Sequence, residues 1–521
     1  MDITGTATIY DLLVERTAEH ADMDYLVFVG AESDTTNMTY QEFVESVDRF
    51  ATGLHREGIG QGSGVILHMR TGLEFLSCWF ALAKIGAISV PTNLASAPPE
   101  LAHAIAKSNA EFVITETSFM ETFELATQSR DVQIRKFIVK GAEGGSAGTT
   151  PLDRIVESHR DEQTSGHADI DSTAVAEILF TSGTTALPKG AQLTHANLIR
   201  AGYRVAHHYQ LDHDDRVLSM LPLFHVGGQA MGVMCALVAG STCVLVERYS
   251  ASSFWDQVKE HRPTFAMVVP THVRTLLAQE AKPDDRDHTL SKVAFGLKIT
   301  DEERSLFEDR FNIRLTYCYG QTEAILLIAI APLTGDRHWP AVGLPAFDRN
   351  VRVVDADGED VPVGEVGEVI VEADPGRTVM LGYANDPEAT ENTIREGWLY
   401  TGDYASFDSR GFLHFADRKK DMIKRAGENV SALEVETVLT AHPLIDDAAV
   451  IGIPDPIRDE AVKAFVVISP GKSLSDEDIG EHCRKHLSAF KIPTVIEYRE
   501  SLPKTSIGKT IKQELRQSAG N

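Results

Sequence analysis

The chain has 521 residues, with 49 lysines and arginines against 76 aspartates and glutamates, so its formal net charge is −27. At roughly 100–200 residues per domain, this length predicts two to four domains. Apolar residues make up 43% and charged residues 24%, which is ordinary for a globular protein and argues against wholesale disorder. The acidic balance disfavours binding to nucleic acids or anionic membranes, because both depend on lysine and arginine.

Cysteine usage and the N-terminus favour a cytoplasmic protein. The five cysteines are odd in number and widely spaced, which fits neither a disulfide framework nor a zinc site. Residues 1–10 lack the basic and apolar regions of a secretory signal. Residues 217–246 carry no Asp, Glu, Lys or Arg and could span a bilayer by length, but Pro222 and several glycines interrupt them. We therefore expect buried core there and no membrane partner.

The first half of the chain alternates short apolar runs with longer amphipathic stretches, which is typical of strand–helix–strand units in a parallel sheet. Strands are expected at 65–69, 88–91 and 111–115, and helices at 73–85 and 99–108. Further along, an apolar strand at 174–180 leads into a loop rich in glycine and hydroxyl groups. Thr194 then starts a helix at 195–200.

Past Gly343 the pattern changes to short strands separated by turns, at 351–355, 368–372 and 412–415, which predicts a small β-rich subdomain. After Lys420 a compact α+β pattern follows, with helices at 433–441 and 475–487 and strands at 446–453 and 463–469. The predicted fold is therefore α/β. A large N-terminal domain spans 1–418, with its β-rich subdomain at about 343–418, and a small C-terminal domain spans 419–521.

The charge is divided unevenly between these two domains. Residues 420–521 carry a net charge of −2, which leaves −25 for residues 1–419. From Arg484 onward eight basic residues face three acidic ones. A basic tail on an acidic protein indicates a unit that handles an anion, although an ordinary solvated surface would look the same.

The strongest motif is Leu-Phe-Thr-Ser-Gly-Thr-Thr-Ala-Leu-Pro-Lys-Gly at residues 179–190. Gly183 lets backbone N–H groups converge on an anion, and Lys189 adds a positive charge. Hydroxyl donors come from Thr181, Ser182, Thr184 and Thr185. The loop is not a Walker A motif, because Gly-Lys-[Ser/Thr] is absent. The plainer alternative is a surface loop with a solvated lysine.

With this loop the sequence resembles the adenylate-forming enzymes, which include acyl-CoA synthetases, firefly luciferase and peptide-synthetase adenylation domains. The resemblance covers nearly the whole chain, with eight landmarks in the family's order. They are residues 84–87 with Pro91, then 181–190, 222–225, 319–323, 400–403, 417–424, 426–430 and 503–509. Each is weak alone, but their common order leaves little room for chance.

The resemblance implies an ATP-dependent acid–CoA ligase, that is, an acyl-CoA synthetase that releases AMP and pyrophosphate. It would form an acyl-adenylate and then an acyl-CoA thioester, swinging a mobile C-terminal domain about a hinge at Lys420. ATP, Mg²⁺ and coenzyme A would be required, and a small carboxylic acid would be the substrate. Gly427 would line the tunnel for the pantetheine arm of coenzyme A.

The resemblance also implies individual roles. Lys509 would bridge the substrate carboxylate and the α-phosphate, and Glu323 would bind Mg²⁺. Asp403 and Arg418 would hold the ribose. The catalytic set is Lys509, Glu323, Thr181 and Thr322. The ATP and AMP set is Thr181, Ser182, Gly183, Thr184, Thr185, Lys189, Tyr319, Gly320, Gln321, Thr322, Glu323, Asp403, Arg418 and Lys509. The acid and coenzyme A set is His225, Gly296, Ile325 and Gly427.

Several positions depart from the family pattern. Ala186 stands where glycine is usual, Ala426 precedes Gly427, and residues 294–298 read Ala-Phe-Gly-Leu-Lys. The identity of the acid substrate is therefore not inferred from the family. Residues 176–185, 244–251, 254–255, 457–460 and 463–466 carry a further likeness within the family. In these segments the sequence most resembles crotonobetaine/carnitine–CoA ligases, which suggests a small acid, either bearing a quaternary ammonium or uncharged. The residues expected to wall the pocket are Phe224, Phe295, Leu297, Tyr317 and Ile325.

Two other functions stay open. The same adenylation chemistry could serve another acceptor or acid, such as a carrier-protein thiol, an amine or nitrite. Alternatively the chain could be a nucleotide-binding regulatory protein without turnover, although the joint presence of Lys509, Glu323 and Gly427 argues against that function. The oligomeric state and the pathway are not readable from the sequence.

Overall fold

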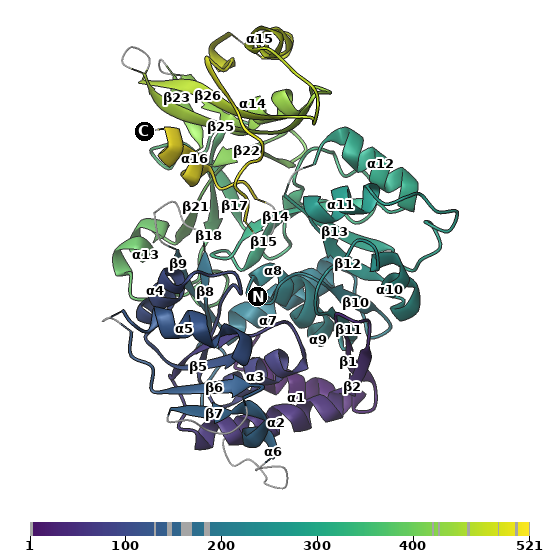
Figure 1. The fold of residues 1–521 in the computed structure, drawn as a ribbon, viewed down its shortest axis with the longest axis vertical. Coiled ribbons are helices and arrows are strands. Elements are labelled where there is room, and N and C mark those ends of the chain that lie inside the picture. Colours follow the sequence, from purple (N-terminus) through teal and green to yellow (C-terminus); the bar gives the residue numbers. More distant parts are fainter. Residues whose placement is uncertain are drawn as a thin grey trace.

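The computed structural model describes residues 4–129, 132–142, 148–157, 169–181, 188–297, 299–418, 421–425, 428–455, 459–487, 489–505 and 509–519. These residues form four sheets (Figure 1). We call them the N-terminal, central, β-rich and C-terminal sheets. In Figure 1 the first two make up the lower body of the molecule and the C-terminal sheet lies at the top.

The N-terminal sheet is parallel from β8 to β7 and closes with two antiparallel strands at its other edge. Its strand order is β19 (Gly382–Tyr383), β9 (Lys189–Thr194), β8 (Val175–Thr181), β4 (Ile88–Pro91), β3 (Gly64–His68), β5 (Ala110–Glu116), β6 (Lys136–Lys140) and β7 (Thr149–Pro151). Its associated helices are α3 (Leu73–Lys84), α4 (Pro98–Ser108), η1 (Thr117–Phe119), α5 (Met120–Ala126) and α6 (Leu152–Glu157).

The central sheet is parallel in its middle and has antiparallel strands at both edges. Its order is β16 (Leu344–Pro345), β15 (Leu326–Ile330), β14 (Leu315–Gln321), β13 (Lys292–Gly296), β12 (Phe265–Val268), β10 (Arg216–Ser219), β11 (Thr242–Val246), β1 (Asp24–Val29) and β2 (Thr35–Thr39). Its helices are α1 (Ile9–His20), α2 (Tyr40–Arg56), α7 (His195–Tyr209), α8 (Val226–Gly228), the π-helix η2 (Gln229–Met234), α9 (Cys235–Ala239), α10 (Phe254–His261), α11 (Pro270–Leu277) and α12 (Asp301–Phe311).

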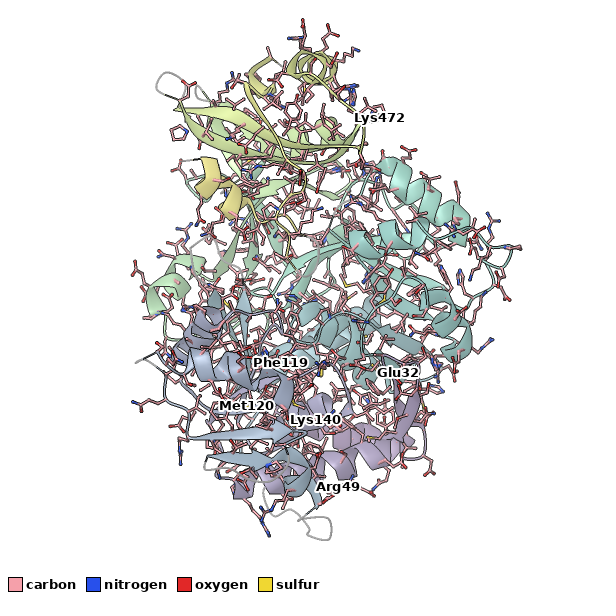
Figure 2. All side chains as sticks on the ribbon, viewed as in Figure 1. Glu32, Arg49, Phe119, Met120, Lys140 and Lys472 are labelled. Carbon is pink, nitrogen blue, oxygen red and sulfur yellow. The ribbon has the colours of Figure 1, made fainter. Side chains whose placement is uncertain are left out.

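Two apolar layers hold the two large sheets in place. One core runs from the N-terminal sheet through α2, α3 and α7 to the central sheet, and Phe43, Trp79 and Leu245 belong to it. A second core covers the opposite face of the central sheet beneath α10, α11 and α12, around Phe295 and Phe307. Figure 2 shows side chains filling the space between these layers. The carboxyl ends of strands from both sheets therefore stay in a fixed relation.

The β-rich sheet has the order β17 (Val351–Val354), β18 (Gly367–Glu372), β21 (Trp398–Phe407) and β20 (Ile394–Arg395), and β22 (Leu413–Arg418) pairs with β21. Helix α13 (Pro387–Thr393) precedes β20. The C-terminal sheet has the order β24 (Glu428–Ser431), β23 (Met422–Arg425), β26 (Asp459–Ile468) and β25 (Ile445–Asp455), and β27 (Val495–Tyr498) pairs with β26. Its helices are α14 (Ala432–Thr440), α15 (Asp476–Arg484), η3 (Ala489–Lys491) and α16 (Lys512–Ala519).

The predicted α/β fold is confirmed, including the β-rich part and the small α+β C-terminal part, and the predicted elements agree within a few residues. Two details differ. Strand β9 was not expected before the helix at Thr194, because Lys-Gly-Ala-Gln has a weak strand propensity. Strands β16 and β19 fall inside the range 343–418 but join the central and N-terminal sheets. The domain limits at 418 and 419 stay a prediction.

The uncharged stretch 217–246 is core, as predicted. It contributes β10, α8, η2, α9 and β11, and most of its side chains are buried. Among the described residues, none of the helices combines the length and apolar character needed to cross a membrane.

Candidate active site

Two strands from different sheets end side by side at the centre of the molecule. β8 ends at Thr181, and β14 leads into Glu323 two residues after its last residue. The hydroxyl of Thr181 donates a hydrogen bond to Oε1 of Glu323 at 3.0 Å. In open α/β sheets, ligands bind outside the carboxyl ends of strands. This contact therefore marks a candidate active site, and it joins two residues that the sequence predicted together.

Tyr383 completes this contact, although the sequence did not point to it. Its hydroxyl donates to the same Oε1 of Glu323 at 3.0 Å. β19 places Tyr383 opposite Ala191 of β9, and Nζ of Lys189 lies 5.0 Å from the centre of the tyrosine ring. Burial, and then the charge of Glu323, raise the pKa of Tyr383, so the phenol stays protonated and acts as a donor.

The Glu323 carboxylate fits the Mg²⁺ ion that was predicted at this position. Both hydroxyl donors approach Oε1, and among the described residues no hydrogen bond to Oε2 is found. Mg²⁺ takes one or two protein carboxylate oxygens and completes its shell with phosphate oxygens and water. Glu323 is half-buried, which leaves its free oxygen accessible to such an ion.

A second contact lies at the end of the β21–β22 hairpin. The hydroxyl of Tyr319 donates to Oδ2 of Asp403 at 2.7 Å, and both residues are more than nine-tenths buried. The strand register places Asp403 directly opposite Arg418. Side chains at opposed positions on paired strands lie about 5 Å apart at Cβ, so both can reach one ligand. The predicted ribose pair thus occupies one rung of a sheet, although the side chain of Arg418 is outside the described part.

The turn between β14 and β15 is tightly constrained. A Cβ added to Gly320 would lie 1.5 Å from the carbonyl oxygen of Leu326, so only glycine fits. Ile325 and Leu326 both have positive φ angles, of 49° and 75°. The N–H of Ile325 donates to the carbonyl of Thr322 at 2.9 Å. The predicted residues 319–323 and Ile325 therefore form one rigid turn.

Buried arginines fix this turn from behind. Arg204 is fully buried, and its guanidinium donates to the carbonyl of Ile325 at 2.9 Å and to Asp348 at 2.7 and 2.9 Å. Burial alone would raise the pKa of Asp348, but the hydrogen bond and charge of Arg204 outweigh it and lower that pKa to about 2. Arg349 donates to the carbonyl of Ala324. These pairs hold the backbone that carries Glu323.

Two predicted residues have buried side-chain nitrogen atoms that lack a hydrogen-bond partner among the described residues. Nε2 of His225 and Nε2 of Gln321 are buried, and neither has a hydrogen-bond partner among the described residues. Burial lowers the pKa of His225 to about 4, so the ring is neutral near pH 7. A buried donor or acceptor without a partner is costly unless a ligand or water satisfies it. His225 and Gln321 thus have the character of ligand contacts.

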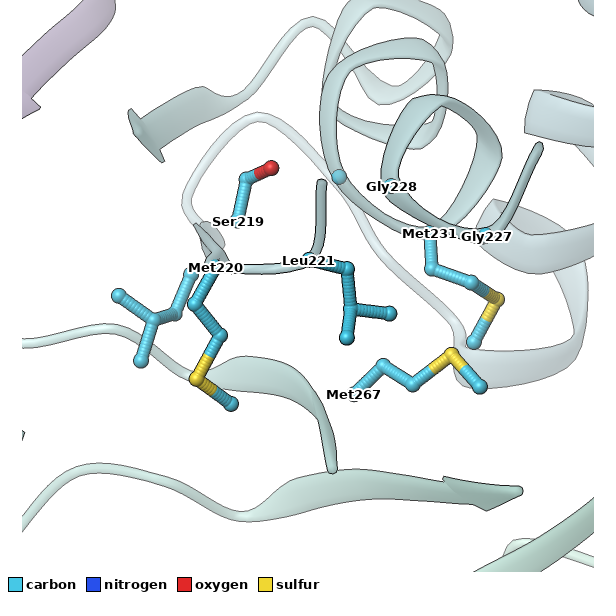
Figure 3. A pocket seen from close by; sticks show the side chains of 9 residues that line it. Ser219, Met220, Leu221, Gly227, Gly228, Met231 and Met267 are labelled. Atoms are coloured by element: carbon cyan, nitrogen blue, oxygen red, sulfur yellow. The ribbon is translucent and has the colours of Figure 1, made fainter. Parts of the chain in front are cut away.

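A small cavity is lined by the end of β10 and the residues that follow it, by α8 and η2, and by one residue of β12 (Figure 3). Its volume is about 10 Å³, close to the space that one water molecule needs. Its lining is Leu218, Ser219, Met220, Leu221, Gly227, Gly228, Met231, Gly232 and Met267, and none of these carries a charge. A Cβ added to the predicted residue Gly296 would lie 2.9 Å from Cε of Met267. The flexible thioether chain of Met267 therefore fills the space beside Gly296.

Phe295 and Tyr317, two of the residues expected to wall the acid pocket, do not line this cavity. Register pairs Met267 with Ala294, but Val268 with Phe295 and Phe295 with Tyr317. Because successive side chains of a strand alternate between faces, Phe295 and Tyr317 point away from Met267. The two rings are 5.5 Å apart in the core under α11 and α12. Leu297, with a φ of 72°, is 40% exposed.

The remaining predicted residues are described only in part. Lys509 closes a short loop: its N–H donates to Oγ1 of Thr505 at 3.1 Å, and its carbonyl accepts from the N–H of Thr505 at 2.8 Å. Outside the described residues lie Ser182, Gly183, Thr184, Thr185, Ala186, Lys420, Ala426 and Gly427. The predicted phosphate loop is thus described only at its two ends, Thr181 and Lys189, which are paired in β8 and β9.

Comparison with protein families gives two matches along the chain. The AMP-binding enzyme family matches residues 14–384, and the AMP-binding enzyme C-terminal domain matches residues 434–509. The chain belongs to the AMP-binding enzyme family. A crotonobetaine/carnitine–CoA ligase of Proteus mirabilis is 39% identical over 521 residues, covering 99% of this chain and 100% of the relative. One of Salmonella typhimurium is 38% identical over 523 residues, with the same coverage.

Solved structures of the family agree. An anthranilate CoA ligase in complex with anthranoyl-AMP is 25% identical, with a TM-score of 0.88, covering 100% of this chain and 98% of that one. ATP-bound MatB from Rhodopseudomonas palustris is 25% identical, with a TM-score of 0.86 over 98% and 99% of the chains. These findings confirm the predicted adenylate-forming family, the class of acid–thiol ligase, and the requirement of the family for ATP and coenzyme A.

Proposed function

We propose that this chain activates a small carboxylic acid with ATP and transfers the acyl group to coenzyme A. In the first half-reaction a carboxylate oxygen attacks the α-phosphorus, pyrophosphate leaves and an acyl-adenylate forms. In the second, the thiolate of coenzyme A attacks the acyl carbon and AMP leaves. The observation that carries the proposal is the meeting of Thr181, Tyr383 and Glu323 at the carboxyl ends of β8 and β14.

The phosphate end of the site is assigned to Thr181, Thr322, Glu323, Lys189 and Lys509. A bound Mg²⁺ would neutralise phosphate charge at Glu323. Thr181 and Tyr383 hold Oε1 of that carboxylate and so direct Oε2 outward. Lys509 contributes an ammonium to the charge that develops on the α-phosphate. Ser182, Gly183, Thr184 and Thr185 supply the remaining donors of the phosphate loop.

The nucleoside end is assigned to Tyr319, Gly320, Gln321, Asp403 and Arg418. Asp403 offers two carboxylate oxygens, and the hydroxyl of Tyr319 engages Oδ2 from one side. A carboxylate opposite an arginine suits the two hydroxyls of a ribose, since one group accepts and the other donates. Gln321 and His225 are assigned to the junction with the acid, where their unpartnered nitrogen atoms are buried.

The two-domain arrangement belongs to the proposal as well. The β-rich sheet ends with β22 at Arg418, and the C-terminal sheet starts with β23 at Met422, so a hinge at Lys420 falls between them. We assign residues 1–418 and 419–521 to the two domains, and Gly427 to the tunnel for the pantetheine arm. A cytoplasmic location accords with the five cysteines, which are all buried and unbridged.

The acid is proposed to be small. The cavity that Met267 lines has room for about one water molecule, so it offers no space for a long acyl chain. This favours a small acyl group, and the lining of the cavity carries no charge that would pair with a cation. The similarity to crotonobetaine/carnitine–CoA ligases supports testing acids that bear a trimethylammonium group. His225, Gly296, Met267 and Ile325 are the residues assigned to the acid.

The test is pyrophosphate release and AMP release across a panel of acids. Butyrate-sized, aryl, betaine-type and palmitate-length acids are compared by kcat/KM, with coenzyme A present or absent. We expect activity with small acids and AMP release that depends on coenzyme A. Highest kcat/KM for palmitate would contradict the small pocket. AMP release that depends instead on an amine or a carrier-protein thiol would mean that this group, and not coenzyme A, is the acceptor. If no acid gave pyrophosphate release, a regulatory nucleotide-binding protein would be favoured.

A further inference from the structure

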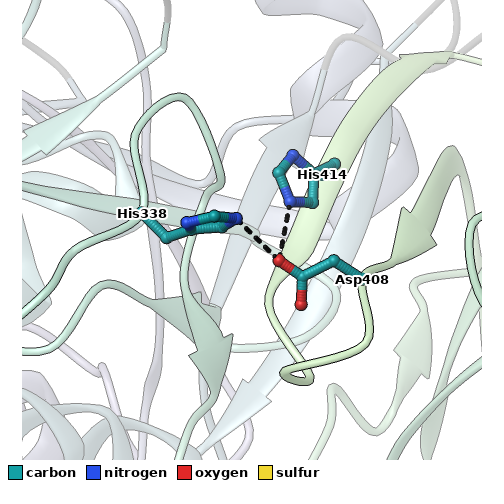
Figure 4. Close-up of side chains that lie close together, drawn as sticks. All are labelled: His338, Asp408 and His414. Atoms are coloured by element: carbon teal, nitrogen blue, oxygen red, sulfur yellow. Dashed lines mark hydrogen bonds and ion pairs between the residues drawn. The ribbon is translucent and has the colours of Figure 1, made fainter.

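A second cluster of ligand-type side chains lies away from the proposed nucleotide site. His338, Asp408 and His414 bring two imidazole nitrogens and one carboxylate oxygen within 4.8 Å of one another (Figure 4). Nε2 of His338 lies 2.9 Å from Oδ2 of Asp408, and Nε2 of His414 lies 3.3 Å from the same oxygen. We propose that these three residues form a binding site for a divalent transition metal of the Zn²⁺ class.

The carboxylate is already oriented for this role. Oδ1 of Asp408 accepts hydrogen bonds from the backbone N–H groups of Arg410 and Phe412, at 2.8 and 2.9 Å. These bonds close the turn between β21 and β22 and leave Oδ2 directed at the two histidines. Metal ligands are typically held by such outer hydrogen bonds, which fix the ligand before the ion arrives.

The spacing suits a small transition metal. At metal–ligand distances of about 2.0–2.2 Å, tetrahedral ligands lie about 3.3 Å apart. The observed separations of 2.9 and 3.3 Å need only small side-chain adjustments. Two imidazoles with one carboxylate suit Zn²⁺ or Co²⁺, whereas Mg²⁺ prefers oxygen ligands. The three side chains are 22–36% exposed, so an ion can enter and solvent can complete its shell.

The cluster is separate from the nucleotide site but shares its supporting hairpin. His414 is the second residue of the strand that carries Arg418, and Asp408 follows the strand that carries Asp403. Four residues of strand correspond to about 13 Å. His338 comes from the loop between β15 and β16, which pairs with the hairpin through Gly343 and Leu413. A bound ion would therefore tie the central sheet to the hairpin.

Arg410 opposes metal binding through its contact with His338. Its guanidinium contacts Nδ1 of His338 and forms an ion pair with Asp336 at 2.8 Å. An imidazole that binds a metal through Nε2 carries its proton on Nδ1. That proton would face the donor groups of Arg410, so the arginine weakens metal binding and keeps the proton on Nε2. Replacing Arg410 with a shorter neutral residue should therefore strengthen binding.

The test is calorimetric titration of the full-length protein, stripped with chelator, with Zn²⁺ in the presence of excess Mg²⁺ and without nucleotide. We expect one site per chain that is at least tenfold weaker in His338→Gln, His414→Gln and Asp408→Asn. Arg410→Gln should bind severalfold more tightly. Co²⁺ should give visible absorption bands in the wild type that the histidine variants lose. The Asp408→Asn variant keeps the backbone acceptor Oδ1, so the turn survives the loss of charge.

The control is His213→Gln, since His213 lies in an exposed cluster with Asp212 and Asp214. Zn²⁺ affinity in this variant should equal that of the wild type. Thermal unfolding without metal establishes that each variant is folded. Equal Zn²⁺ affinity in the wild type and in both His338→Gln and His414→Gln would overturn the proposal, as would a loss of binding in His213→Gln alone.

Discussion

Oε1 of Glu323 accepts a hydrogen bond from the hydroxyl of Tyr383 at 3.0 Å, across 60 residues of sequence. The two residues come from different sheets, and the contact orients the carboxylate assigned to Mg²⁺. A hydrogen bond to a charged group contributes about 1.5–3 kcal/mol, which corresponds to roughly a ten- to hundredfold change in rate. This relationship leads directly to the first prediction.

Tyr383→Phe should lower kcat/KM for adenylation roughly tenfold or more and raise the Mg²⁺ concentration needed for half-maximal rate. The matched control is Tyr249→Phe, which loses a hydrogen bond of 2.7 Å to Thr275 outside the candidate site. Pyrophosphate release is measured against Mg²⁺ concentration. An unchanged Mg²⁺ dependence in Tyr383→Phe would mean that the phenol does not position Glu323.

Asp403→Asn should raise KM for ATP at least tenfold, because the amide offers only one acceptor oxygen for the ribose. Tyr319→Phe should have a smaller effect, of about three- to tenfold, since it removes the 2.7 Å hydrogen bond but keeps the carboxylate. The KM values of both variants are measured by steady-state kinetics with ATP and with 2′-deoxy-ATP. A smaller loss with 2′-deoxy-ATP than with ATP in Asp403→Asn would agree with recognition of the ribose hydroxyls, whereas a KM for ATP unchanged in Asp403→Asn would refute it.

Lys509→Ala should lower the rate of acyl-adenylate formation by at least a hundredfold, because a positioned cation is lost from the developing phosphate charge. Thioester formation from pre-made acyl-adenylate should fall much less. The two half-reactions are measured separately, with Lys504→Ala, which loses an ion pair with Asp447 of 2.6 Å, as the control. Equal losses in both half-reactions would remove the assigned role of Lys509.

Met267→Ala should widen the acid pocket beside Gly296, where Cε of Met267 now fills the space. One methylene in an apolar pocket changes specificity by about tenfold or more. The ratio of kcat/KM for a six-carbon acid to that for a four-carbon acid should therefore rise at least tenfold. Met38→Ala, on edge strand β2, is the control. The same ratio in wild type and Met267→Ala would place the acid elsewhere.

Glu177 makes stability depend on pH. It is fully buried on β8, where it accepts from the amide of Gln229 at 3.0 Å, and burial raises its pKa to about 8. Between about pH 4.5 and 8 the folded chain holds a proton that the unfolded chain has lost. Stability therefore falls as pH rises through this window, with a slope of at most about 1.4 kcal/mol per pH unit.

Glu177→Gln should remove this dependence. Its amide keeps an acceptor for Gln229 without a charge, so the variant should gain stability relative to the wild type as pH rises from 5 to 8. Urea unfolding at several pH values measures the difference, and each profile is compared with its own value at pH 5. A constant difference across the range would show that Glu177 does not retain its proton.

The fold and the residues at the ends of β8 and β14 could be predicted because both depend on local sequence patterns. Strands β3, β4 and β5 are mostly buried and contain short apolar runs, and the turn at the end of β14 needs the glycine that the motif contains at Gly320. Tyr383 was not predicted, since a two-residue strand has no periodicity and its partner lies 60 residues away. Such a contact depends on how two sheets pack.

The residues that wall a pocket were the hardest to predict from the sequence. Phe295 and Tyr317 belong to the predicted segments, but whether a strand residue faces the ligand or the core depends on register, and one step reverses the face. Their neighbours show that they face the second core, whereas Met267, on the opposite face, lines the cavity. The buried arginines Arg204 and Arg349 were also missed, because an isolated arginine in a sequence is usually a surface residue.

The contact between Thr181 and Glu323 spans 142 residues of sequence and joins two sheets. Contacts of such long range form late in folding, because the chain must close a large loop before they stabilise anything. Neither half of the molecule can assemble this site on its own. During refolding, helical signal should recover before enzymatic turnover, and mild denaturant should abolish turnover while most secondary structure persists.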